Sequence, residues 1–309
     1  MAQKICQKSM TQETSNLDPH NTERPPHAFL RDTCIGAPTG CVPSVTSLLP
    51  GFALGWTAIS ASGRFVGISS GTSAFLHDTC FGAPVGCVPA ARPIDTQPNG
   101  EKGQVSLSAD GRFAVFLSGQ FTCSDWDYGC SSAQGQVYLA DTCVGVSSGC
   151  TPSSRAITQS DVPAVHAAAR EVFIHPSISP DGRFVTFNTS ARDVWFYDSC
   201  QGAPASCSPS TIMVSVASDG SPADADSFGG TASVGGRYVA FVSSATNLVP
   251  SIPVPGVLRV YVRDMCTGAP SRCTPATTSV SVAGDGTFAD DPSISADGRY
   301  IAFASGPPT

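Results

Sequence analysis

Short apolar runs, broken by turns that contain glycine, recur along most of the chain. The first pattern reads ISASGRFVGI from Ile59, LSADGRFAVF from Leu107, ISPDGRFVTF from Ile178, SVGGRYVAF from Ser233 and ISADGRYIAF from Ile294. Asp-Gly and Gly-Gly favour tight hairpins. Each copy therefore predicts two antiparallel strands, here named A and B, joined by a Ser-x-x-Gly-Arg turn.

A second pattern alternates with the first. Five strand-like runs end in aspartate and lead into a Cys-x6-Cys segment: AFLRD, AFLHD, VYLAD, VWFYD and VYVRD. A run rich in Thr, Val and Ser follows the cysteine pairs, most clearly at 211–216 and 277–282. We predict strands C and D on the two sides of each cysteine loop, so that one unit holds four antiparallel strands.

The repeat distance is that of a β-propeller blade with its loops. The first cysteines of the five segments are Cys34, Cys80, Cys143, Cys200 and Cys266, which are separated by 46, 63, 57 and 66 residues. A four-stranded blade plus connections fits within such a period. The stretch at 161–173 is the one place where the sequence allows a short helix.

The two ends of the chain carry complementary half-units, a C–D hairpin first and an A–B hairpin last. We expect an all-β propeller with five blades of four antiparallel strands, the terminal blade shared by the N- and C-terminal hairpins. A fragment of a six- or seven-bladed propeller is the alternative. Residues 1–26 are polar and predict a disordered tail, which leaves 27–309 as a single propeller domain.

The repeat resembles a known family. SISPDGRFVTF, SISADGRYIAF and VYVRD are similar to the WD-like propeller repeats of the TolB type, and VSSATNLVP at 242–250 resembles a bacterial, exported subgroup. The resemblance covers most of the chain from about residue 27. It implies the propeller fold but no particular partner, since such propellers bind diverse partners. The Cys-x6-Cys hairpin is not part of the general repeat.

The thirteen cysteines are best explained as local disulfides. Residues seven apart across a tight loop can face each other, whereas a metal site would need four ligands from separate blades, and redox motifs favour Cys-x-x-Cys. The predicted pairs are Cys34–Cys41, Cys80–Cys87, Cys123–Cys130, Cys143–Cys150, Cys200–Cys207 and Cys266–Cys273. Cys6 is left over.

Composition and charge limit the class of partner and the cellular compartment. A net charge of -7 argues against a nucleic-acid partner, and no apolar run is long enough to span a membrane. So many cysteines are unusual in a reducing compartment, so we expect a periplasmic or extracellular protein. No signal peptide is visible at the N-terminus.

Two acidic loops are the only metal candidates. They contain Asp219, Asp224, Asp226, Asp285, Asp290 and Asp291. Oxygen-rich loops can hold calcium, but these lack the spacing of an EF-hand loop, and solvated turns are the favoured interpretation. No catalytic residue and no cofactor are assigned.

The leading hypothesis is a non-catalytic binding propeller that presents variable loops to a protein or glycan partner. Large differences in length fall in the B–C loops and the D-to-A connections, at 119–136, 159–173, 217–229 and 244–257. Binding residues concentrate on such loops, and Trp126 is a candidate for the partner face. The alternatives are a glycosidase-like five-bladed enzyme, or the propeller of a larger peptidase.

Overall fold

The computed structural model describes residues 28–35, 39–48, 56–96, 100–123, 130–158, 165–166, 176–189, 192–250, 255–281 and 288–306, with only the backbone described at 120–123, 130–134 and 165–166. Regular structure within these ranges is β, apart from a 3-10 turn at Val234–Gly236. None of these residues forms a helix long and apolar enough to cross a lipid bilayer.

Four complete blades follow one another along the chain, each with the antiparallel strand order A-B-C-D. Blade 1 consists of β3 (Thr57–Ile59), β4 (Phe65–Ser70), β5 (Ser73–Asp78) and β6 (Ala90–Pro93). Blade 2 consists of β7 (Glu101–Leu107), β8 (Phe113–Cys123), β9 (Cys130–Asp141) and β10 (Ser153–Ala156). Blade 3 consists of β12 (Ser177–Ile178), β13 (Phe184–Asn188), β14 (Val194–Asp198) and β15 (Ser210–Met213). Blade 4 consists of β16 (Ser227–Ala232), β17 (Tyr238–Ser243), β18 (Arg259–Asp264) and β19 (Ala276–Ser279).

Two half-blades complete the strand inventory. The N-terminal hairpin is β1 (Ala28–Asp32) with β2 (Ser44–Leu48), in the C and D positions, and the C-terminal hairpin is β20 (Phe288–Ile294) with β21 (Ile301–Gly306), in the A and B positions. Together with the complete blades they supply the strands of five four-stranded blades, so the predicted all-β propeller class is confirmed. In place of the short helix, β11 (Val165–His166) pairs with β9.

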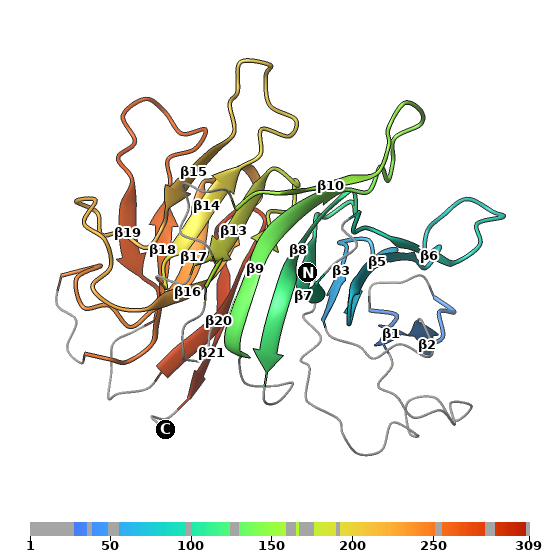
Figure 1. Cartoon of the computed structure of the whole chain (residues 1–309), viewed down its shortest axis with the longest axis horizontal. Helices are drawn as coiled ribbons and strands as arrows, with labels where there is room; N and C mark the ends of the chain where they lie inside the picture. Colours follow the sequence, from blue (N-terminus) through green and yellow to red (C-terminus); the bar gives the residue numbers. More distant parts are fainter. Residues whose placement is uncertain are drawn as a thin grey trace.

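The expected sharing of one blade by both ends needs correction. Among the described strands, β1–β2 and β20–β21 form two separate two-stranded sheets, and they lie well apart in Figure 1. Each hairpin buries its apolar face on the blade that is next to it in sequence. Leu30 and Leu48 pack with Ile68 of blade 1, and Ala289 packs with Val242 of blade 4. This local packing positions the hairpins without any pairing between them.

The core lies between neighbouring blades rather than within one sheet. Leu117 and Val137 of blade 2, for example, pack with Val185 and Phe187 of blade 3. Strand B has a paired strand on each edge and a blade on each face, so β4 and β13 are buried along their whole length. β21 takes the B position in the last half-blade, where it has one paired edge among the described strands, and its residues are mostly exposed.

Glycine in the A–B turns of blades 2 to 4 and of the C-terminal hairpin lets the preceding blade approach closely. The aromatic residue after the turn arginine of one blade packs under the turn glycine of the following blade. A Cβ at Gly111 would lie 2.7 Å from the Phe65 ring, and one at Gly236 would lie 2.7 Å from the Phe184 ring. The turns are also joined by backbone hydrogen bonds, since the amide of Ala61 donates to the carbonyl of Ala109 at 2.9 Å.

The close approach can be tested with a matched pair of substitutions. Gly63 and Gly111 both have a φ of +75°, but a Cβ at Gly63 would meet nothing within 4 Å. Gly63→Ala should therefore lose only the left-handed backbone strain, about 1 kcal/mol. Gly111→Ala adds overlap with Phe65 and should lose about 3 kcal/mol in total. Equal losses in urea unfolding of the two variants would contradict this account of how blades pack.

Candidate functional site

The two edges of the propeller differ in character. In an antiparallel A-B-C-D blade, the A–B turn and the C–D hairpin lie on one edge, named here the turn edge. The B–C loop and the D-to-A connection lie on the other, named here the loop edge. Figure 1 shows the C–D hairpins in teal, green, yellow and orange extending beyond the sheets.

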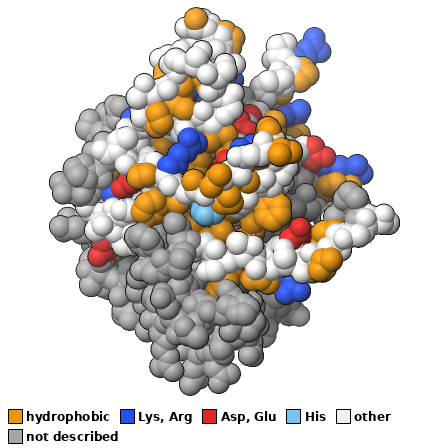
Figure 2. Space-filling model, turned by 90° about the vertical axis from the view of Figure 1, so that its right-hand side faces the viewer, with side chains coloured by type: hydrophobic (Ala, Val, Ile, Leu, Met, Phe, Trp, Pro, Cys, Tyr) orange, Lys and Arg blue, Asp and Glu red, His pale blue; other side chains and the backbone are white. Residues whose placement is uncertain are grey.

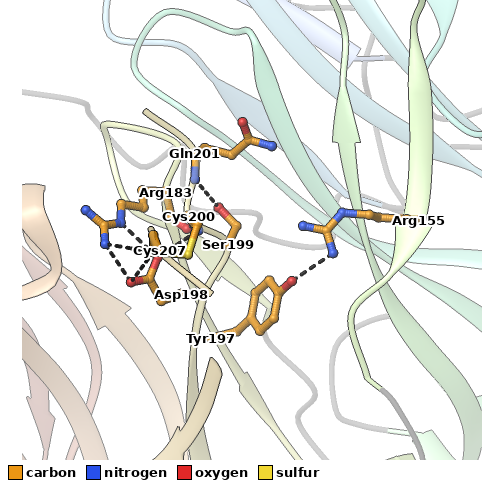
Figure 3. The surroundings of a disulfide bond; sticks show 8 residues. All are labelled: Arg155, Arg183, Tyr197, Asp198, Ser199, Cys200, Gln201 and Cys207. Atoms are coloured by element: carbon orange, nitrogen blue, oxygen red, sulfur yellow. Dashed lines mark hydrogen bonds and ion pairs between the residues drawn. A yellow bond between two sulfur atoms is a disulfide. The ribbon is translucent and has the colours of Figure 1, made fainter. Parts of the chain in front are cut away.

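The turn edge repeats one ion pair in every complete blade. The arginine of the A–B turn binds the aspartate that ends strand C through two parallel hydrogen bonds. The pairs are Arg64–Asp78, Arg112–Asp141, Arg183–Asp198 and Arg237–Asp264. In blade 3, Nε and Nη2 of Arg183 lie 2.8 and 2.7 Å from the two Asp198 oxygens (Figure 3). The guanidinium also lies 4.7 Å from the centre of the Phe184 ring.

The same aspartate shapes the cysteine hairpin. Oδ1 of Asp198 accepts a hydrogen bond from the Cys200 amide at 2.8 Å, and Cys200 has a φ of +61°. This turn directs the Cys200 side chain to Cys207, with which it forms a disulfide (Figure 3). The carboxylate therefore joins strand B, strand C and the hairpin in one place.

Five of the six predicted disulfides are confirmed. They are Cys34–Cys41, Cys80–Cys87, Cys143–Cys150, Cys200–Cys207 and Cys266–Cys273. Cys123 and Cys130 lie opposite each other in the β8–β9 pairing, but their side chains are outside the described part of the chain. Cys6 also lies outside it, so these two predictions stay untested.

The turn edge brings sulfur and carboxylate groups together without making a metal site of them. In each of five Asp–Cys–Cys groups, such as Asp198, Cys200 and Cys207, the ligand atoms lie within 4.8 Å of one another. A cysteine binds a metal as the thiolate, whereas these sulfurs are joined to each other. In the four complete blades the carboxylate is also held by arginine. The geometry is that of a structural clamp.

The acidic candidates are dispersed, and Asp290 and Asp291 lie within β20 rather than in a loop. Asp219 accepts from Ser221, and the amide of Asp291 donates to Asp290. Asp224 and Asp226 lie in the connection between blades 3 and 4, and Asp285 falls outside the described residues. None of them belongs to the described groups of three or more potential ligands. The prediction of solvated turns, with calcium as the alternative, stays untested.

Three segments of the loop edge are joined by polar contacts at blades 3 and 4. The carboxylate of Asp224, in the D-to-A connection, accepts hydrogen bonds from the amide and the hydroxyl of Thr246 in the B–C loop of blade 4. The Asn247 side chain donates to the Pro222 carbonyl at 2.7 Å. Arg192, in the B–C loop of blade 3, forms an ion pair with Asp226.

Two buried polar atoms at this edge have no hydrogen-bond partner among the described residues. They are Oδ1 of Asn188 and Oγ1 of Thr189, both at the end of β13. Nearby in sequence, burial raises the pKa of Asp193, which accepts one hydrogen bond from Ser215 at 3.1 Å. A buried acceptor without a partner is uncommon in proteins. Sequence analysis missed these two atoms, because no motif marks their residues.

The predicted aromatic contact lies outside what the structure describes. Trp126 is in the segment 124–129, which has no described placement. Trp56 and Trp195 are partly buried and pack against the buried clusters of blades 1 to 3. Exposed hydrophobic side chains gather instead on the first two C–D hairpins, at Ile35, Val42, Phe81, Val85 and Val88. Figure 2 shows this end of the molecule, with hydrophobic side chains at the surface.

Comparisons with known proteins give distant structural similarity. No family model matches the chain. No curated protein matches it either. Solved structures similar to it include dipeptidyl peptidase 4 of Porphyromonas gingivalis, at 14% identity and a TM-score of 0.47, covering 82% of this chain and 36% of that one. An oligogalacturonate lyase in complex with manganese has 12% identity and a TM-score of 0.45, covering 80% and 59%. A protein described as TolB, from Agrobacterium tumefaciens, has 16% identity and a TM-score of 0.29, covering 85% and 94%.

The chain thus spans about a third of the length of the peptidase. Similarity at this level does not indicate a function for the chain.

The disulfides should contribute measurably to stability. Each closes a loop of about eight residues, for which the chain-entropy relation gives roughly 2.5 kcal/mol. We expect the double variant Cys200→Ala/Cys207→Ala to lose about this amount of unfolding free energy in urea, with its fold intact. Non-reducing peptide mapping of the wild type should recover the Cys200–Cys207 peptide pair, and a long-range bridge there would contradict the assignment.

Stability should fall at acid pH through the ion-pair aspartates Asp78, Asp198 and Asp264, whose pKa is lowered in the folded state. The hydrogen bond from Arg64 is the main cause that lowers the pKa of Asp78 below 3.8. Burial opposes this at Asp198, but hydrogen bonds from Arg183 and the Cys200 amide outweigh it and also lower its pKa. Because the pKa is lower in the folded state, the stabilisation is complete above about pH 4 and is lost as the pH falls further.

We therefore expect the unfolding free energy to be flat from about pH 7 to 5 and to decline from about pH 4 to 2. Asp78→Asn should be less stable at neutral pH and should show a shallower decline, measured by urea unfolding across the pH series. A decline as steep as that of the wild type would show that Asp78 takes no part.

Proposed function

We propose that the chain is a binding module whose loop edge takes a protein or glycan partner. The contrast between the two edges carries this proposal. The turn edge repeats the same ion pair and disulfide in each complete blade, so these side chains bind one another and stabilise the fold. The loop edge differs in every blade, and at blades 3 and 4 its segments are held together by Asp224, Thr246, Arg192 and Asp226. Loops that are ordered before binding lose less entropy when a partner is bound.

The chemistry of the loop edge favours a partner rich in hydrogen-bond donors. The exposed carboxylates of Asp219 and Asp224, in the D-to-A connection between blades 3 and 4, can accept hydrogen bonds, and the half-buried Asp193 lies in a neighbouring B–C loop. Sugar hydroxyls and peptide amides both supply such donors. The TolB-type resemblance of the repeat fits a partner-binding role.

An oxidising location supports the same proposal. Five disulfides within one chain are typical of proteins in the periplasm or the extracellular space. We infer export from this redox chemistry, and either compartment fits it.

A glycosidase-like activity is the second candidate function, because one carboxylate of the loop edge has a raised pKa. Burial raises the pKa of Asp193, as an acid catalyst requires. Such an enzyme needs a second carboxylate, for which Asp226 is the candidate. Hydrolysis of polysaccharide substrates by the wild type, lost in Asp193→Asn, would favour this function over simple binding.

The binding proposal can be tested by altering one edge at a time. Asp224→Lys removes the acceptor that ties two loops together and reverses a charge on the loop edge. Val85→Lys adds the same side chain to a fully exposed position of the turn edge. We expect glycan-array signal, or capture of partners from the periplasm or medium, to fall tenfold for Asp224→Lys, a change of about 1.4 kcal/mol, and to be unchanged for Val85→Lys. The reverse result would place the partner on the turn edge.

A further inference from the structure

The two half-blades carry the two halves of a contact that every complete blade forms. Each of the four complete blades pairs an arginine of its A–B turn with an aspartate at the end of strand C. The C-terminal hairpin has the arginine, Arg299, and the N-terminal hairpin has the aspartate, Asp32. Within the described part of the chain, neither side chain has an ion-pair partner. One charge of each sign is thus left at the two ends.

The strand register places further groups opposite one another. In the complete blades the aromatic residue that begins strand B lies opposite this aspartate, as Phe184 lies opposite Asp198. The same register would set Tyr300 opposite Asp32. The residue after the aspartate also binds strand B, since the Thr79 amide donates to the Arg64 carbonyl at 2.8 Å. Its counterpart Thr33 is exposed and forms no hydrogen bond in the described structure.

The turn contact between blades is also left incomplete at both ends. Four aromatic residues pack against the turn glycine of the following blade, the last being Tyr238 against Gly298. Tyr300 has no following turn glycine in the described chain and is 60% exposed. At Gly63, the space where a Cβ would lie is open, with no aromatic ring of a preceding blade in it. Each end therefore lacks the group that the other presents.

β21 is also much more exposed than the B strands of complete blades. Strand B is buried from end to end in blades 1 and 3, whereas β21 exposes four consecutive residues, among them Phe303. An edge strand with exposed apolar residues is a template for another strand. The edge of β21 that pairs with no described strand faces the position that strand C takes in a complete blade.

We propose that the C-terminal hairpin β20–β21 of one copy of this chain binds the N-terminal hairpin β1–β2 of a second copy. The contact would complete an A-B-C-D blade between two copies, with Arg299 bound to Asp32 and Tyr300 packed on Gly63. Opposite charges face each other there, and the contact continues the interface that already joins the blades. A second copy can bind without moving either hairpin, since each is packed on its own neighbouring blade.

This contact joins different surfaces of the two copies. Head-to-tail contacts of this kind produce closed rings or longer chains, depending on the rotation between copies. The proposal predicts association that depends on protein concentration and on the charges at positions 32 and 299.

A mixing experiment separates association between copies from closure within one copy. Arg299→Asp alone sets two carboxylates against each other at the contact, and Asp32→Arg alone sets two guanidinium groups against each other. Each variant should therefore associate about tenfold more weakly than the wild type in sedimentation velocity. In an equimolar mixture, the unaltered Asp32 of the first variant can meet the unaltered Arg299 of the second, and the two substituted side chains are also of opposite charge. We expect the mixture to recover association between copies.

The control is Arg272→Asp, which makes the same charge change on an exposed C–D hairpin and should leave association unchanged. Circular dichroism of each variant should match the wild type, so that weaker association is not a consequence of misfolding. A wild type that stays monomeric at all concentrations, or a mixture that does not recover association, would overturn the proposal.

Discussion

The ion pair between the turn arginine and the aspartate that ends strand C holds the repeat together. One carboxylate receives the guanidinium from strand B and the amide of the first cysteine, so it fixes two strands and the start of the hairpin. The cysteine can then adopt its left-handed backbone conformation and reach its partner. The guanidinium also covers the aromatic ring that packs against the next blade's glycine. Each blade is thus tied to itself and to its neighbour by the same few atoms.

This arrangement separates structure from variation. The turn edge has the same arginine, aspartate and cysteine pair in each complete blade, and these side chains bind one another. The loop edge does not repeat one set of contacts in every blade, and its loops differ in length and composition. At blades 3 and 4 those loops are nevertheless held by ion pairs and hydrogen bonds, as between Arg192 and Asp226. A rigid scaffold with one variable edge is suited to recognition.

The same ion pair is incomplete in each of the two half-blades. A complete blade satisfies both members of the pair within itself, whereas each half-blade holds only one member. In the described structure, Arg299 and Tyr300 at one end, and Asp32 and Gly63 at the other, lack the partners that their counterparts have in the complete blades. Their chemistry follows from the repeat rather than from any special feature of the ends.

The sequence by itself determined the strand pattern, the four-strand unit and five of the disulfides, whereas the tertiary structure decided how the hairpins lie and which loop residues meet. The first group depends on residues close in sequence, such as the seven-residue spacing of Cys200 and Cys207, and on turns read from Gly and Asp. Sequence analysis assigned the turn aspartates to turn formation, which Asp110 fulfils by accepting from the Arg112 amide at 2.9 Å. The ion pair of Arg112 with Asp141 was not foreseen, because 29 residues separate its members.

The expected shared blade required β1 and β21 to pair, but each hairpin found apolar surface on the blade next to it in sequence. The meeting of Asp224 with Thr246, and the partnerless Oδ1 of Asn188 in the described structure, depend on the packing of blades 3 and 4. Only the tertiary structure could decide such contacts. They bring together residues without a common motif, because the chain must fold before they become neighbours.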